Sequence, residues 1–233
     1  MRAKFINEEY EIQDEFEKIT KLMINKNLKK DVIYYLCDFL DINDFNILKK
    51  FIKDKICIII NSRFHWSDGA VFIGPSDFEE LNLPEYKEYR YTNINKTNCP
   101  IGVIELSDMV GIDHSGSIFG NQKNYSNKHF ITKIDSSFIH ELRHAYNDYI
   151  SEGKASNNYS RESNEEISAI IAGMTNDIEW YSNNEIRPFK EILSLFQRAQ
   201  GLEYNKLSAD TKKRFIRKIS QIWHIKKDRI KNK

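Results

Sequence analysis

The segment from Ser137 to Asp148, "SFIHELRHAYND", places an H-E-x-x-H pattern inside a stretch with helical spacing. Apolar residues recur there every three or four positions, which predicts a helix with one buried side. They are Phe138, Ile139, Leu142, Ala145, Tyr146, Tyr149 and Ile150. Candidate N-caps precede the stretch at Asp135, Ser136 and Ser137, and Gly153 is a candidate stop after it. The motif is therefore predicted to lie on a partly buried helix.

On such a helix His140 and His144 lie one turn apart on the same face, so both imidazoles can reach one zinc ion. Glu141 falls beside them. Zinc lowers the pKa of a bound water to about 7, and a carboxylate within reach can accept its proton. The spacing thus predicts a zinc metallohydrolase, most often a protease, with one Zn²⁺. A solvated helix with two incidental histidines is the alternative interpretation.

The rest of the chain predicts an α+β fold in which helices precede and follow a sheet. Helical spacing covers 8–25 and 30–53, and short β-branched or aromatic runs at 56–61, 70–76, 86–94 and 101–107 predict a small mixed or antiparallel sheet. Further helices are expected near 136–150, 162–181, 186–200 and 208–230. We expect one domain over 1–233, with a helical part at 1–55, the sheet at 56–120, zinc-site helices at 134–182 and C-terminal helices at 183–233.

A catalytic zinc site needs a third protein ligand, and the segment after Gly153 offers Glu162, Glu165 and Glu166. On a helix Glu166 shares its face with Ala169, Ile170 and Gly173, which are small or apolar and would allow close packing against the motif helix. The expected burial of this face therefore favours Glu166 as the third ligand. Glu165 remains the alternative, and all three acids also suit a helix N-terminus.

The strings "HELRHAY", "EE" and "NEIR" resemble, in that order, the zinc protease light chains of the clostridial neurotoxins. The second Glu of the pair binds zinc in that family, which implies Glu166 here, and the eighteen-residue step from Glu166 to Asn184 also matches. A related group of bacterial effector proteases, injected into host cells, shares the first two features and is closer in size. The resemblance implies a zincin-like fold and a gluzincin-type endopeptidase with Glu141 as general base.

The resemblance covers about 138–187 and departs from the family in two ways. His144 and Glu166 are twenty-two residues apart, which is shorter than in the neurotoxins. The later Arg-x-x-Tyr pair that stabilises the oxyanion in that family is absent. Nothing in the sequence chooses a replacement, and the candidates left open are Tyr204, Tyr181, Tyr159 and Arg187.

The sequence says less about where the protein acts than about its fold and its motif. The N-terminal residues are charged and show no apolar leader, and no run is long enough to span a membrane. The cysteines Cys37, Cys57 and Cys99 are an odd number at wide spacings, which predicts buried or free thiols in a reducing compartment. With the resemblance, this suggests a toxin or effector acting on a protein in the cytosol of a host cell, or otherwise a cytoplasmic protein. The sequence indicates neither the substrate nor the oligomeric state.

Residues 201–233 carry eleven basic and three acidic groups and keep helical apolar spacing. A docked helix with a solvated basic face is the favoured interpretation. The alternative function is a non-enzymatic binding protein that uses this helix to contact nucleic acid, a membrane or a partner protein. Other histidines suggest no site: His65 is expected in a hairpin, His114 and His129 in a Gly-rich loop, and His224 on the tail helix. The loop at 111–129 is also a candidate for an irregular edge strand that could hold substrate.

Overall fold

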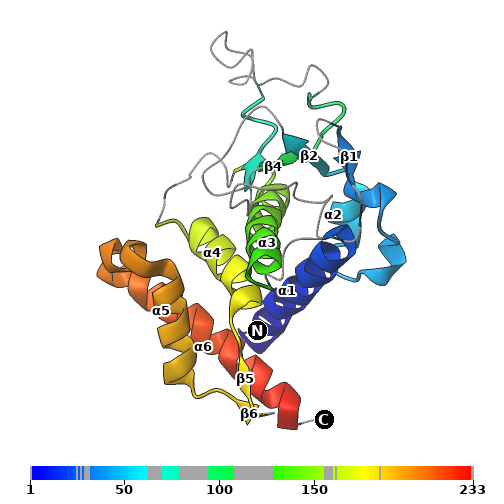
Figure 1. The fold of residues 1–233 in the computed structure, drawn as a ribbon. Coiled ribbons are helices and arrows are strands. Elements are labelled where there is room, and N and C mark those ends of the chain that lie inside the picture. Colours follow the sequence, from blue (N-terminus) through cyan, green and yellow to red (C-terminus); the bar gives the residue numbers. More distant parts are fainter. Residues whose placement is uncertain are drawn as a thin grey trace.

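The computed structural model has an α+β architecture in which the long helices lie on one side of a small mixed sheet (Figure 1). It describes residues 2–24, 26, 28, 32–61, 70–78, 94–107, 128–154, 160, 162–183 and 185–231. The expected strand at 86–94 lies almost wholly outside this part, as do most of the loop at 111–129 and the residues His65, His114, Tyr159 and Asn184. In the described part, no helix is long and apolar enough to cross a membrane.

Four strands form the main sheet in the order β1-β2-β4-β3. They are β1 (Tyr34–Tyr35), β2 (Cys57–Asn61), β3 (Ala70–Ile73) and β4 (Val103–Ser107). β2 and β4 are parallel, whereas β1 and β3 pair antiparallel with their neighbours. The strands predicted at 56–61, 70–76 and 101–107 are therefore confirmed, and β3 is an edge strand of the described sheet.

Alternate residues of the strands enter two different cores, as the two-residue period of a strand requires. One face packs against α1 (Arg2–Ile24) and α3 (Lys128–Ile150). Ile58, Ile60 and Ile104 lie in this larger core together with Phe16 and Leu142. The opposite face carries a smaller cluster around the two cysteines. The larger core thus holds the motif helix against the sheet.

Residues 30–53 differ from the one or two helices that their spacing predicts. They form β1, two 3₁₀ turns at Leu36–Asp38 and Ile42–Asp44, and the short helix α2 (Lys49–Lys53). The Asp41 carboxylate accepts the backbone N–H of Asn43 at 2.9 Å, which offers the backbone a local alternative to the helix. Apolar residues such as Leu36 and Phe51 are still buried. The spacing of apolar residues therefore identified the core residues but not the secondary structure that they adopt.

The expectation of three thiols is wrong for Cys57 and Cys99, which form a disulfide. Cys57 begins β2, and Cys99 lies in the turn that leads to the parallel neighbour β4, so strand pairing brings together residues that are 42 apart in sequence. Cys37 is the free cysteine and is half-buried. Between Cys99 and β4, Gly102 has a φ of +122°. A Cβ there would lie 2.6 Å from the Ile73 carbonyl oxygen, so glycine permits this close approach to β3.

The C-terminal helices form a second core on the side of α4 (Asn164–Asp177) away from α3. They are α5 (Phe189–Lys206) and α6 (Ala209–Lys231), and a two-stranded ribbon of β5 (Tyr181–Ser182) and β6 (Glu185–Ile186) precedes them. Ile171 of α4, Phe196 of α5 and Phe215 of α6 are buried in this core. The helices expected near 162–181, 186–200 and 208–230 are therefore present.

The basic helix α6 is docked, as the sequence predicts. Its apolar residues Phe215 and Ile219 are buried. Several of its cations contact the protein itself, because Lys226 lies over the rings of Tyr10 and Trp180 and Lys227 lies over Trp223. Lys226 is therefore held against α1 and the segment before β5, whereas the contact of Lys227 lies within α6 itself.

Glu162 joins the start of α4 to the start of α6. Its carboxylate accepts hydrogen bonds from the hydroxyls of Ser208 and Thr211 and from the backbone N–H of Ser208. These bonds lower the pKa of Glu162 to about 2, because they favour the charged carboxylate. Glu162 therefore has a structural contact at the N-terminal end of α6.

Candidate metal centre

Helix α3 places two imidazoles together at the centre of the site. His140 and His144 are one turn apart, and their Nε2 atoms are 3.0 Å from each other. The helix begins at Lys128, so the predicted caps Asp135, Ser136 and Ser137 lie inside it, and His129 lies in the helix rather than in a loop. The predicted stop is confirmed: the chain turns at Gly153, whose N–H donates to the Asp148 carbonyl at 2.9 Å.

Helix α4 supplies a carboxylate to the same point. Its N-cap Ser163 accepts the backbone N–H of Glu166 at 3.0 Å, which fixes the first turn of the helix. The Glu166 side chain is buried, with Oε2 at 3.0 Å from His144 Nε2 and Oε1 at 3.9 Å from His140 Nε2. Of the three acids that the sequence offered, the structure brings Glu166 to the histidines.

Gly173 allows α4 to approach α3 beside His140. A Cβ at Gly173 would lie 2.6 Å from the Ser136 carbonyl oxygen and 3.4 Å from the His140 Cβ. The 2.6 Å contact is with backbone, so it could be relieved only by moving one helix. The close packing that the sequence predicted for Gly173 is therefore present, and it sets the position of Glu166 relative to the histidines.

The variant Gly173→Ala is expected to lower the free energy of unfolding by about 1–3 kcal/mol, because the added methyl overpacks the α3–α4 contact. Alanine normally stabilises a helix interior relative to glycine by about 0.5–1 kcal/mol, so the expected sign is the reverse of helix propensity. Urea unfolding measures the change. Asn176→Ala on the same helix is the control and should change stability little. A Gly173→Ala protein as stable as the unmodified chain would contradict the tight contact.

The three side chains together could hold a metal ion. Their donor atoms all lie within 4.8 Å of one another. A tetrahedral zinc ion with bonds of about 2.0–2.1 Å separates two ligand nitrogens by about 3.3 Å, close to the spacing of the two imidazoles. Two imidazoles and one carboxylate are a donor set that zinc accepts, and they leave a position open. The residues present therefore fit a zinc ion.

The protonation of the histidines also suits a cation. Burial and the nearby His144 lower the pKa of His140 to about 4, so this imidazole is neutral at pH 7 and available as a ligand. Burial acts to lower the pKa of His144 too, but the hydrogen bond to Glu166 and the charges of Glu141 and Glu166 outweigh it, so the pKa is raised. The carboxylates of Glu141 and Glu166 thus favour a positive charge beside the two imidazoles.

Glu141 is held between the metal-site histidines and the edge of the sheet. Its Oε1 lies 3.9 Å from His140 Nε2, and its Oε2 accepts the backbone N–H of Phe72 in β3 at 2.7 Å. A hydrogen bond to the ionised carboxylate stabilises that form. The sequence did not reveal this contact, because it joins residues 69 apart and depends on strand register.

The other candidates lie elsewhere in the described structure. Arg187 pairs with Glu179 at 2.7 Å and with Glu191 at 3.5 Å, beyond the C-terminal end of α4. Tyr204 packs on Phe215 in the second core, and its hydroxyl accepts a hydrogen bond from Gln197. Glu165, the alternative third ligand, is half-buried next to Glu166. Tyr181, an oxyanion candidate, is exposed in β5, and His224 is exposed on α6.

No protein-family model matches this chain, and neither the curated proteins nor the solved structures contain a significant match.

Proposed function

We propose that this protein is a zinc-dependent metalloendopeptidase of the zincin, gluzincin type. His140, His144 and Glu166 would hold zinc, and Glu141 would act as general base. The observation that carries the proposal is the convergence of these three donors from two helices, with a second carboxylate, that of Glu141, beside them.

Each group has a role that its chemistry supports. When bound, zinc supplies a Lewis acid that polarises a peptide carbonyl and lowers the pKa of water. Glu141 accepts the proton of the attacking water and passes it to the leaving amine. The N–H of Phe72 holds Glu141 in place and favours its ionised form, which is the form that a base requires.

The surroundings of the site suit an extended polypeptide. β3 is an edge strand of the described sheet, and its residue Phe72 contacts the proposed base. An extended peptide that ran beside this edge would bring its backbone close to Glu141, although the N–H of Phe72 is bonded to that carboxylate and would not pair with the peptide. The resemblance to neurotoxin light chains and injected effectors suggests a secreted or injected toxin-like protease and a protein of a host cell as substrate.

The proposal is tested by metal analysis followed by a search for cleaved protein termini. The purified full chain should contain one zinc ion, and His140→Ala should remove it. Incubated with a cell lysate, the zinc-loaded protein should generate new termini by mass spectrometry that the His140→Ala protein does not. Thr175→Ser, a conservative change within α4, controls for the effect of substitution. A metal-free protein that binds DNA with strong salt dependence would instead support the alternative binding function of α6.

A further inference from the structure

The disulfide lies in the same small core as the end of β3, the strand that contacts the proposed base. Cys57 and Cys99 are fully buried in this core, together with Ile73. Backbone hydrogen bonds tie both cysteines to Gly102. Its N–H donates to the Cys99 carbonyl at 3.1 Å, and its carbonyl accepts the N–H of Cys57 at 3.2 Å. The disulfide and these two bonds therefore fix the position of Gly102.

Gly102 in turn supports the end of β3. A Cβ at Gly102 would lie 2.6 Å from the Ile73 carbonyl oxygen and 2.6 Å from a ring carbon of Phe72, so its backbone packs closely against both residues. The N–H of Phe72 donates to the Glu141 carboxylate at 2.7 Å. A continuous series of contacts thus runs from the disulfide through Gly102 and Phe72 to the proposed base.

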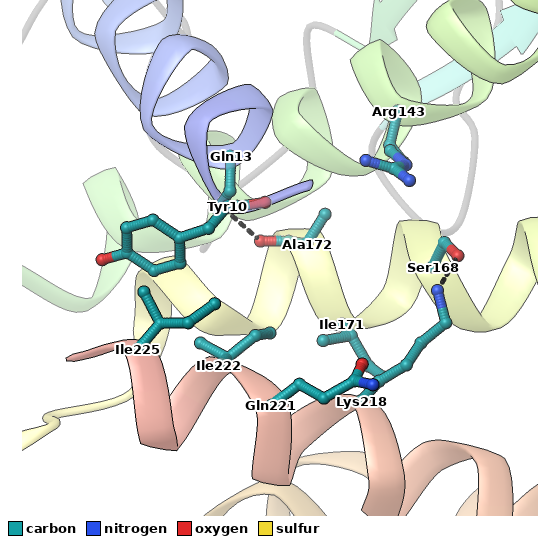
Figure 2. A pocket seen from close by; sticks show the side chains of 10 residues that line it. All are labelled: Tyr10, Gln13, Arg143, Ser168, Ile171, Ala172, Lys218, Gln221, Ile222 and Ile225. Carbon is teal, nitrogen blue, oxygen red and sulfur yellow. Dashed lines mark hydrogen bonds between the residues drawn. The ribbon is translucent and has the colours of Figure 1, made fainter. Parts of the chain in front are cut away.

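The proposed zinc ligands are held by other contacts. They lie on α3 and α4, and the contact at Gly173 sets the approach of these two helices. In addition, the Gln13 amide ties α1 to α4 by donating to the Ala172 carbonyl at 2.9 Å, and the Lys218 ammonium ties α6 to α4 by donating to the Ser168 hydroxyl (Figure 2). These contacts involve neither the disulfide nor β3.

We propose that the Cys57–Cys99 disulfide is a redox-sensitive positioning element for Glu141, so that the oxidised chain is the fully active form. This inference rests on the proposed protease function. In the reduced chain two thiols replace the covalent link, Gly102 loses part of its support, and the end of β3 can move away from α3. Glu141 then loses the hydrogen bond that aims its carboxylate, whereas zinc remains bound.

The reaction that closes the link is thiol–disulfide exchange. The two thiols give up two protons and two electrons, and the disulfide bond of oxidised glutathione takes them up and yields two glutathione thiols. Because both cysteines are fully buried, a small thiol reaches them only after a local opening of the structure. Reduction is therefore expected to be slow, and the chain should keep its disulfide for a time after it passes from an oxidising to a reducing compartment.

The double variant Cys57→Ala/Cys99→Ala tests the proposal in the full chain. Its kcat on a substrate identified by cleaved termini should fall by about 10–100-fold, because a displacement of about 1 Å can cost as much as about 10²-fold. Its zinc affinity should be unchanged. Cys37→Ala, which removes the free thiol, is the matched control and should keep the normal kcat. A double variant with normal kcat, or one that loses zinc together with activity, would overturn the proposal.

Amide hydrogen exchange measured by NMR is a second readout, which does not depend on cleavage and covers a double variant that fails to fold. Exchange at the N–H of Phe72 should be faster in the unmodified chain after glutathione has reduced it from one free thiol to three. Oxidised glutathione should restore slow exchange and cleavage together. Equal exchange in both forms would overturn the proposal. A chain that cleaves no peptide but shows the expected change would count against the protease function alone and support the link from the disulfide to β3.

Discussion

Replacement of Glu141 by glutamine is expected to lower the rate of peptide cleavage by about 10²–10⁴-fold while zinc remains bound. Glutamine has nearly the same shape, and its amide oxygen can still accept the N–H of Phe72, so β3 and α3 should keep their places. The amide cannot accept the proton of the attacking water. The loss should therefore appear in kcat rather than in the metal content.

The control for this variant is Glu152→Gln, which removes an exposed carboxylate after the end of α3. Both proteins are assayed on the same substrate, identified by its cleaved termini, and zinc is measured in each. Glu152→Gln should cleave at the normal rate. A zinc-loaded Glu141→Gln protein with full activity would show that another group acts as base.

The helices that carry the candidate site could be predicted from the sequence, because the spacing of apolar residues within one segment determines which face of a helix is buried. The buried residues of α3, such as Phe138 and Leu142, recur at helical spacing, and this pattern located the helix that carries the motif. The same reasoning placed Glu166 and Gly173 on one face of α4. The structure shows this face against α3.

The parts that could not be predicted depend on contacts between distant segments. The Cys57–Cys99 disulfide follows from the pairing of β2 with β4, and cysteine spacing alone does not reveal which strands are neighbours. The contact between Glu141 and Phe72 depends on the register of β3 in the same way. Apolar spacing over 30–53 also failed to distinguish a helix from irregular segments that bury the same residues.

The residues of the candidate metal centre were predicted by more than one signal, whereas those beyond it rested on the resemblance alone. Glu166 matched both helical phase and the family motif, and it lies beside His144. Arg187 was carried over by the motif alone, and its guanidinium is engaged by Glu179 and Glu191. An ion pair at that position holds the segment between β6 and α5, so the structure supplies a local role for Arg187 that needs no substrate.

Exchange of Glu166 for glutamine is expected to weaken zinc binding by at least about 100-fold, above the usual effect of groups that only support a ligand. The variant keeps the volume of the side chain and the backbone bond to Ser163, but it removes the anionic donor that lies 3.0 Å from His144 Nε2. Competition with a chromophoric chelator measures the affinity. Glu165→Gln is the matched control, because it makes the same charge change one residue earlier on a half-buried side chain. It should retain nearly normal affinity, since helical phase turns residue 165 about 100° away from residue 166. If Glu165→Gln weakened binding as much as Glu166→Gln, the third ligand would be wrongly assigned, and α4 would have to present a different face to the histidines.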